Sequence, residues 1–318
     1  MLVGLLMRIS LCVCSKQIES RLRKMMLLRR KDKVVFVMGA TGTGKSRLSI
    51  DLATRFNGEI INSDKMQVYR GLDVITNKVT EDECRGVPHH LLGMVDPDHD
   101  FTVRDFVYHA TLAADAITRR GRLPIVAGGS NSYIKALVHD DFEFRSKYEC
   151  CLLWVNVATP VLNSFVSKRV DQMVEAGLVA EANEFFDPSG DYSRGIKRSI
   201  GVPEMDDYFR NYIDDETRAK TELKVAIDRI KSNTCMLACR QLEKISWLED
   251  KLDLRIHRLD ATGAFTSQVA ESDRAWEKAV TIPATVIVAE FICSDDIGRF
   301  MSTLAAPPPM VHTTTSSS

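Results

Sequence analysis

Short apolar runs alternate with amphipathic stretches along the first half of the chain. The run VVFVM before Gly39 is rich in β-branched residues and predicts a buried central strand. After it, residues 46–57 place leucine and phenylalanine at spacings of four, which predicts a helix. The strand pattern recurs at 58–64, 122–129 and 151–158, and residues 101–119 predict another amphipathic helix. Strands that alternate with helices indicate a parallel α/β sheet.

The second half of the chain departs from this alternation. Residues 160–212 have a helical pattern, which predicts an inserted helical lobe. Residues 217–249 predict one long helix, and a late strand at 254–259 and a helix over 272–293 follow it. The long helix carries a stripe with spacings of three and four, typical of a core face, formed by Leu223, Ile227, Ile230, Thr234 and Leu237.

Together with the motif GATGTGKS at residues 39–46, these patterns predict a P-loop NTPase-like fold, a parallel sheet flanked by helices with a small helical inserted lobe. Its predicted parts are a basic leader (1–32), an α/β core (33–159), a helical insertion (160–215), a return to the core through the long and C-terminal helices (216–295), and a disordered tail (296–318). A composition of 45% hydrophobic and 27% charged residues is ordinary for a globular protein of this length.

Charge and cysteine content narrow the function classes. The net charge is −1, so no overall basic field gathers nucleic acid. No apolar run reaches the roughly 20 residues that a membrane-crossing helix needs. The eight cysteines form no matched pair of CxxC motifs, which argues against a zinc site and against a secreted disulfide framework. We therefore expect reduced thiols in an intracellular compartment.

The N-terminus is basic and poor in acids. Residues 1–31 contain eight Lys or Arg residues and one acid, Glu19. This composition resembles an organelle transit peptide, which predicts a plastid location. The alternative is a disordered basic leader without a targeting role in a cytoplasmic protein, because serine is not abundant there.

The stretch GATGTGKS, from Gly39 to Ser46, predicts a phosphate-binding loop between the first strand and the first helix. Its glycines let successive backbone N–H groups point at an anion, and the helix behind them adds its positive end. Lys45 supplies a point charge, and the Ser46 hydroxyl can bind Mg²⁺. Because a strand precedes the loop and a helix follows it, the prediction is specific.

A second motif that usually accompanies such a loop in nucleotide hydrolases is not found in the sequence. A nucleotide hydrolase needs an apolar strand that ends in aspartate to hold the metal, whereas LPIVAGG ends in glycines. The run LLGMVD ends at Asp96, but two histidines lie just before it and a proline follows. Hydrolysis of ATP is therefore poorly supported, and a kinase stays open. Asp64 ends the second strand, where a carboxylate can bind metal, remove a proton or cap the next helix.

Six blocks in order resemble one family, the isopentenyltransferases. They are spread in order over about residues 33–262, which is most of the folded chain, and read GATGTGKS, EIINSDKMQVYRGLDVITNK, GVPHHLLG, VAGGSNSYIKALV, KRVDQMVEAGLVAE and CRQLEKISWL. The family includes tRNA dimethylallyltransferases and the adenylate isopentenyltransferases of cytokinin synthesis. Within the family, the plant adenylate branch is the most similar, judging from the residues of the second block and from the basic leader.

The resemblance implies that the loop holds the diphosphate of dimethylallyl diphosphate and that the nucleotide is an acceptor that is not cleaved. It implies that Asp64 is the base for the adenine N6 amine. Thr41, Lys45 and Arg169 are expected beside the reacting groups, and Mg²⁺ is expected at Ser46. The implied donor diphosphate site consists of Gly39, Ala40, Thr41, Gly42, Thr43, Gly44, Lys45, Ser46 and Ser130.

The acceptor nucleotide is expected to meet a second set of residues. The implied set is Ser63, Asp64, Gln67, Ser130 and Arg240, to which we add the lysine row of the long helix, Lys220, Lys224 and Lys231. Two alternatives stay open. The lysine row has the pattern of a solvated surface, and the Arg240–Gln241 pair fits a salt bridge and a cap.

The predicted function is transfer of dimethylallyl to N6 of AMP, ADP or ATP. The predicted partners are the small-molecule substrates dimethylallyl diphosphate and an adenine nucleotide, and neither nucleic acid nor a membrane is expected. The first alternative is a tRNA dimethylallyltransferase, which would need a basic surface to grip phosphates. The second is a P-loop nucleotide kinase, which adds a phosphoryl group in place of a five-carbon unit. The oligomeric state stays open.

Overall fold

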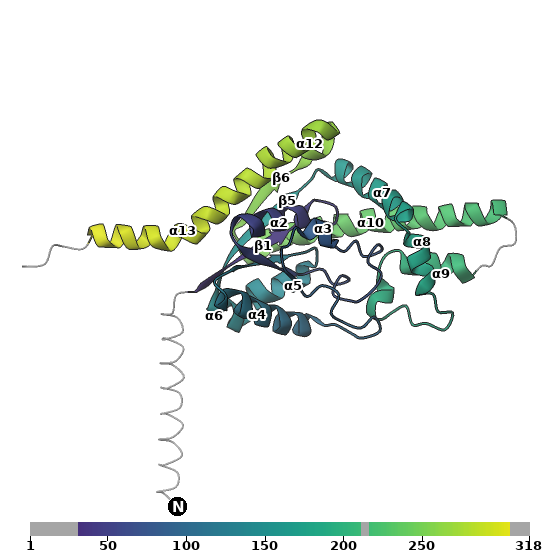
Figure 1. Cartoon of the computed structure of the whole chain (residues 1–318), viewed down its shortest axis with the longest axis horizontal. Coiled ribbons are helices and arrows are strands. Elements are labelled where there is room, and N and C mark those ends of the chain that lie inside the picture. The colour runs from purple at the N-terminus through teal and green to yellow at the C-terminus, as the bar shows by residue number, and fades with distance from the viewer. Residues whose placement is uncertain (1–30, 211–215, 306–318) are drawn as a thin grey trace, which may run out of the picture.

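The computed structural model describes residues 31–210 and 216–305, and its centre is one six-stranded sheet (Figure 1). The strand order is β3-β2-β4-β1-β5-β6, and all five neighbouring pairs are parallel. The strands are β1 (Asp32–Met38), β2 (Gly58–Asn62), β3 (His89–His90), β4 (Leu123–Ala127), β5 (Tyr148–Asn156) and β6 (Ile256–Asp260). The predicted parallel α/β fold is confirmed.

The apolar run of β1 lies at the middle of the sheet because it is buried on both faces. Phe36 pairs with Val126 of β4 and Leu152 of β5. Successive side chains of β1 point to opposite faces, so Phe36 and Val37 belong to two different hydrophobic clusters. The carboxyl ends of β1, β2 and β4 therefore meet at one edge of the sheet, where ligands bind in open α/β folds.

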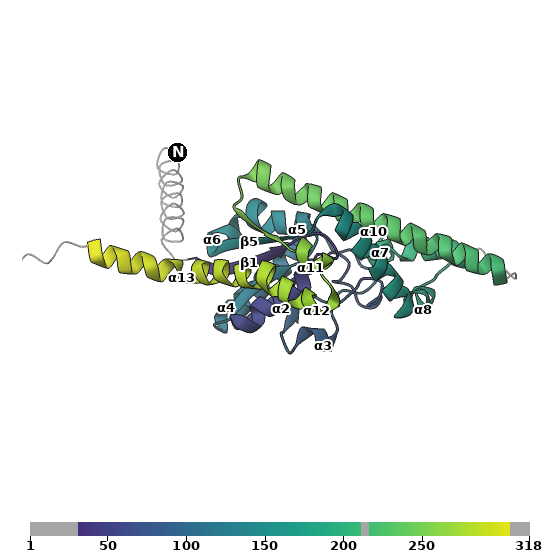
Figure 2. The same cartoon turned by 90° about the horizontal axis from the view of Figure 1, so that it is seen from above.

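Helices cover both faces of the sheet, as Figures 1 and 2 show. Core residues of α4, α5 and α6 pack on one face, and those of α2 and α13 pack on the other. The longer helices are α2 (Lys45–Arg55), α4 (Val103–Arg119), α7 (Thr159–Glu175), α8 (Leu178–Glu184), α9 (Val202–Arg210), α10 (Glu216–Leu252), α12 (Val269–Trp276) and α13 (Ile282–Ala305). Short elements are α3 (Glu81–Cys84), α5 (Asn131–Lys135), α6 (Phe142–Lys147), α11 (Thr262–Thr266), the π-turns η1 (Ala136–Asp140) and η3 (Glu277–Thr281), and the 3₁₀ turn η2 (Gly195–Arg198).

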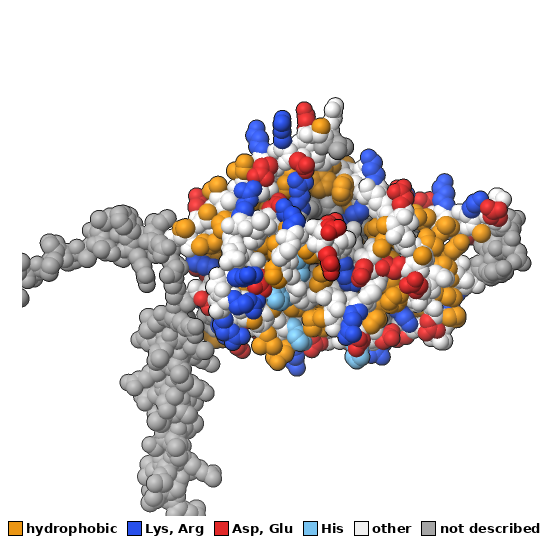
Figure 3. Space-filling model, in the orientation of Figure 1, with side chains coloured by type: hydrophobic (Ala, Val, Ile, Leu, Met, Phe, Trp, Pro, Cys, Tyr) orange, Lys and Arg blue, Asp and Glu red, His pale blue; other side chains and the backbone are white. Residues whose placement is uncertain are grey.

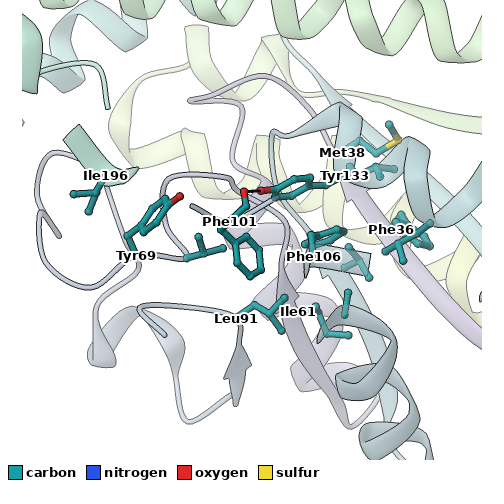
Figure 4. Packing of buried hydrophobic residues seen from close by; sticks show 14 of the residues in the cluster. Phe36, Met38, Ile61, Tyr69, Leu91, Phe101, Phe106, Tyr133 and Ile196 are labelled. Carbon is teal, nitrogen blue, oxygen red and sulfur yellow. Dashed lines mark hydrogen bonds between the residues drawn. The ribbon is translucent and has the colours of Figure 1, made fainter. Parts of the chain in front are cut away.

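One aromatic stack holds the start of α5 beside the carboxyl edge. The rings of Phe106 from α4 and Tyr133 from α5 lie parallel, with centroids 4.3 Å apart. The Tyr133 hydroxyl donates a hydrogen bond to the backbone oxygen of Phe101 at 3.3 Å, as Figure 4 shows. This stack anchors the chain just after Ser130, and so limits the freedom of a predicted site residue.

The region 160–210 is helical, and its first helix belongs to the main core. Leu162 and Val166 of α7 enter the hydrophobic cluster on one face of the sheet, and Val170 enters the other. Helix α7 also packs along α10, whose 37 residues span about 55 Å. The separate helical lobe stays a prediction, but α7 lies within the layer that covers the sheet.

The C-terminal region differs from its prediction. The helix expected over 272–293 is divided into α12, the π-turn η3 and α13. Helix α13 continues to Ala305 and so extends into residues 296–305 of the predicted tail, whose disorder stays a prediction. Residues 1–30 of the predicted leader and 306–318 of the predicted tail lie outside the described residues. Within the described residues, no helix combines the length and the apolar character required to cross a membrane.

Candidate active site at the carboxyl edge of the sheet

A cavity of about 1190 Å³ opens at the carboxyl ends of β1, β2 and β4. Its other walls come from α7, α10 and the α11–α12 segment, and Figure 3 shows this face hollowed between α12 and α7. Although the whole chain carries a net charge of −1, the cavity lining is basic. It includes seven Lys or Arg residues (Lys45, Arg47, Lys65, Arg169, Arg198, Arg240, Lys244) and three acids (Asp64, Glu83, Asp273).

The phosphate loop forms one end of the cavity. Gly42 and Gly44 have φ values of +83° and +89°, which only glycine adopts without strain. Gly44 also lies against the Trp276 indole, because a Cβ atom there would be 2.4 Å from Cη2. Lys45 donates from Nζ to the Ala40 oxygen at 2.7 Å. Burial lowers the pKa of Lys45 to about 8, and the nearby Asp64 carboxylate opposes that shift.

The loop is contacted from α7 by Arg169. This guanidinium donates from Nη2 to the Thr41 hydroxyl oxygen at 2.7 Å. Burial lowers the pKa of Arg169, and the charge of Asp64 opposes this effect. The Arg169 Nε atom is fully buried and has no hydrogen-bond partner within the described part of the chain. Three predicted catalytic residues, Thr41, Lys45 and Arg169, therefore lie in the same cavity.

Asp64 lies two residues after the end of β2, and the local chain fixes its orientation. Its N–H donates to the Asn62 side-chain oxygen at 3.0 Å, and its Oδ1 accepts from the N–H of Met66 at 2.9 Å. Asn62 Nδ2 also donates to the Leu91 oxygen at 3.0 Å. The second carboxylate oxygen, Oδ2, makes no hydrogen bond to any residue between 31 and 210 or 216 and 305. The helix-cap alternative is not supported, because turns follow Asp64.

The remaining residues at this edge divide into two groups. Ser130 and Gln67 line the cavity. Ser130 Oγ accepts a hydrogen bond from the N–H of Lys65 at 2.9 Å, and Gln67 donates to the Thr76 oxygen at 3.1 Å. Ser63 is fully buried and does not reach the described lining, which corrects its predicted role as an acceptor contact. Its backbone lies under Gly128, where a Cβ atom would be 2.3 Å from the carbonyl carbon of Ser63.

The lysine row of α10 is not part of the described cavity lining, which corrects its predicted role. Residues Ile230, Thr234 and Gln241 of α10 do line the cavity. On an α-helix, the lysine row lies about 100° around the axis from that face. Two members of the row are engaged elsewhere: Lys220 pairs with Glu216 and Lys231 with Asp171, each at 2.6 Å, while Lys224 is exposed.

The cavity contains functional candidates that the sequence interpretation missed. On α10, Lys244 lines it beside Arg240. Gln241, which the sequence interpretation named without placing it in a binding site, lines it too, and the spacing of both residues continues the stripe that ends at Leu237. Opposite them, burial and then the charge of Arg198 lower the pKa of Lys65. The α10 residues could have been found by extending the helical stripe. The approach of Arg198 to Lys65 depends on folding and has no local signal.

Two adjacent histidines occupy β3, and their side chains have different surroundings. His90 Nε2 lies 2.6 Å from Oε2 of the buried Glu59, which also accepts from Arg120 and Arg122. His89 lines the cavity, and burial lowers its pKa. This alternation follows from the strand geometry.

Comparisons with known proteins agree with this geometry. The family model described as IPP transferase matches residues 67–146 and 140–251. The chain is 55% identical over 292 residues to adenylate isopentenyltransferase 5, chloroplastic, of Arabidopsis thaliana, covering 89% of this chain and 88% of the relative. It is 54% identical to adenylate isopentenyltransferase 7, mitochondrial, of the same species, covering 88% of this chain and 86% of the relative.

Two solved structures have a similar fold. One is a eukaryotic dimethylallyltransferase acting on tRNA, with a TM-score of 0.70, 26% identity and coverage of 83% of this chain and 80% of that chain. The other is a tRNA isopentenylpyrophosphate transferase from Bacillus halodurans, with a TM-score of 0.66, 28% identity and coverage of 83% of this chain and 100% of that chain.

Proposed function

This chain belongs to the IPP transferase family, and we propose that it transfers the dimethylallyl group of dimethylallyl diphosphate to N6 of the adenine of AMP, ADP or ATP. One observation carries this proposal. Asp64, Lys45 and Arg169 line a single cavity together with the phosphate loop, so a base and a diphosphate site share one space. The relatives named adenylate isopentenyltransferases support a free nucleotide as the acceptor.

The phosphate loop is suited to the leaving diphosphate. Cleavage of the allylic C–O bond transfers its electron pair to the bridging oxygen, which then carries negative charge. Backbone N–H groups, the N-terminus of α2 and the cations Lys45 and Arg169 stabilise that charge. Ser46 is exposed to the cavity in the first turn of α2, so its hydroxyl and the donor phosphates would hold Mg²⁺. The ion would neutralise phosphate charge.

Asp64 is suited to the acceptor. The N6 amine is a weak nucleophile because its lone pair is delocalised into the adenine ring. As the new C–N bond forms, the amine nitrogen becomes acidic, and Oδ2 of Asp64 accepts its proton. A positioned base of this kind contributes about 10²–10⁴-fold to the rate.

The acceptor's own phosphates have two pairs of cations available in the cavity. Lys65 lies near Arg198, and Arg240 lies one turn before Lys244 on α10. We propose that these pairs replace the lysine row of α10 as the nucleotide-phosphate contacts. Point charges and the planar guanidinium group both suit a phosphate tail.

The second candidate acceptor is an adenosine in tRNA. The two similar solved structures carry titles that name tRNA, and the basic cavity lining could contact phosphates of either kind of acceptor. Free nucleotide is favoured because relatives with 54–55% identity are named adenylate isopentenyltransferases.

A product assay tests the proposal. Full-length protein, Mg²⁺ and dimethylallyl diphosphate are incubated in parallel with AMP, ADP, ATP and unmodified tRNA, and products are identified by mass. We expect a five-carbon addition to free nucleotide that Asp64→Asn abolishes. The control is Asp250→Asn, which changes an exposed residue of α10. Product on tRNA alone would refute the free-nucleotide proposal, and phosphoryl addition would indicate a kinase.

Location is a separate proposal. Relatives are named chloroplastic and mitochondrial, and residues 1–31 are basic. We propose that this segment directs the protein to the plastid. A fluorescent fusion that enters plastids only when residues 1–31 are present would support it, and cytoplasmic fluorescence of the complete fusion would refute it.

A further inference from the structure

We propose that Gln241 is a positioning residue that fixes the phosphate loop relative to the loop that carries Asp64. The inference rests on the proposed function, because it concerns the distance between the donor carbon and the amine that Asp64 deprotonates. Gln241 projects from α10 between the chain segments that follow β1 and β4, and it is 8% exposed. It makes hydrogen bonds to both segments.

The two hydrogen bonds of the Gln241 amide determine its orientation. Oε1 accepts from the backbone N–H of Thr41 at 2.7 Å, and Nε2 donates to the backbone oxygen of Gly129 at 3.0 Å. A backbone N–H can only donate and a carbonyl oxygen can only accept, so the reversed amide would lose both bonds. The backbone oxygen of Gln241 also accepts from Asn131 Nδ2 at 3.0 Å. One glutamine of α10 thus holds two segments, the loop after β1 and the segment after β4.

The contact with Gly129 lies next to the base. A Cβ atom on Gly129 would be 2.4 Å from Gln241 Nε2 and 3.8 Å from Asp64 Oδ2. The adjacent Ser130 contacts both neighbours of Asp64, since its N–H donates to the Ser63 oxygen at 3.2 Å and its Oγ accepts from the Lys65 N–H at 2.9 Å. A continuous set of hydrogen bonds therefore runs from Thr41 to the segment that holds Asp64.

Thr41 is held from a second helix as well. Its N–H is bound by Gln241 of α10, and its hydroxyl oxygen accepts from Arg169 of α7 at 2.7 Å. Residues 42–46, which contain Gly42, Gly44, Lys45 and Ser46 of the phosphate loop, make no hydrogen bond with Gln241 within the described residues. Loss of Gln241 should therefore disturb the placement of the reacting groups more than the binding of diphosphate.

The cost of such a disturbance is large for the chemical step. Reaction requires the amine nitrogen and the allylic carbon to approach within about 3–3.5 Å, and a misplacement of about 1 Å costs on the order of 10²-fold in rate. A residue that sets this distance should affect kcat. A residue that only stabilises the fold should instead reduce the amount of active protein.

The test uses Gln241→Met in the full-length chain, since methionine has a similar length and no amide. We expect kcat to fall about 10²-fold, with the KM for dimethylallyl diphosphate changed by less than about threefold. The control is Glu243→Gln, an exposed change on the same helix. Circular dichroism measures the folded fraction of each protein.

A second variant, Gln241→Glu, adds a pH readout. An ionised carboxylate can still accept from Thr41, but it repels the Gly129 oxygen. Once protonated, it can donate to Gly129 again, so the ratio of variant to wild-type kcat should rise as pH falls. If Gln241→Met does not fold, this ratio decides the test.

Two results would overturn the inference: a Gln241→Met kcat within threefold of wild type after correction for folded fraction, or a ratio for Gln241→Glu that is independent of pH. Failure of the proposed function has a different signature, since the wild-type protein would then form no prenylated nucleotide, and both proposals would fall together.

Discussion

Replacing Arg169 by methionine should abolish most of the activity while leaving the free energy of unfolding almost unchanged. Methionine keeps an apolar stem of similar length and removes the guanidinium charge. In the native protein this charge is partly buried, it donates to Thr41, and its Nε lacks a hydrogen-bond partner within the described residues.

The structure provides the magnitudes. Loss of the charged hydrogen bond to Thr41 costs about 1.5–3 kcal/mol, and removal of the buried, unpaired Nε–H returns about 1–3 kcal/mol. The two terms nearly cancel, so the free energy of unfolding should change by about 1 kcal/mol or less. In the transition state, loss of one preorganised group that stabilises developing charge costs about 2.7–4 kcal/mol, or 10²–10³ in kcat.

The assay measures kcat by product mass and the unfolding free energy by urea denaturation for wild type, Arg169→Met and Lys168→Met. Lys168 is the matched control, because it is the preceding, exposed residue of α7. A Thr41→Val variant and the double variant test the contact, since residues that act together give non-additive losses. A kcat for Arg169→Met within threefold of wild type would refute the reasoning, and so would a loss of stability large enough to explain the lost activity.

Three further predictions concern Lys45, Gly44 and Lys220. The kcat/KM for dimethylallyl diphosphate should fall as pH rises through about 8, because Lys45 loses its charge there. The Lys45→Arg variant should not show this fall, because arginine keeps its charge. The same fall in Lys45→Arg would show that Lys45 does not cause it. Gly44→Ala should lower the unfolding free energy by about 1–3 kcal/mol, because its Cβ would lie 2.4 Å from Trp276; an unaltered melting temperature would contradict this clash. Lys220→Glu should leave the KM values of AMP, ADP and ATP unchanged, because Lys220 is exposed and pairs with Glu216; a selective loss for ATP would restore the lysine row as a phosphate contact.

Local patterns were sufficient for five of the six strands of the sheet and for the phosphate-loop motif, whereas the two-residue strand β3 has no such pattern. A run such as VVFVM must be buried on both faces, and a GATGTGKS stretch between a strand and a helix has one well-defined geometry. The same reasoning placed Asp64 at the carboxyl edge, because parallel strands end there. The resemblance to a family added Arg169, which has no local signal of a role.

The errors have a common cause. Lys220, Lys224 and Lys231 have the spacing of a helical row, but spacing alone cannot show which face of α10 meets the cavity. Ser63 lies beside Asp64 in the sequence, yet successive residues point in opposite directions, and Gly128 covers it. Both assignments depended on side-chain direction, which is decided by packing against distant segments.

The sequence by itself determined the order of most strands and helices, the phosphate-loop motif and the carboxylate just after β2, because these follow from periodicity and backbone preferences within short stretches. Only the tertiary structure decided that Gln241 would bridge Thr41 and Gly129, more than 100 residues away from it on the chain. Such contacts are set by how α10 packs across the carboxyl edge of the sheet. Hydrogen bonds between distant segments leave no periodic pattern in the sequence, since each partner is an ordinary residue in its own element.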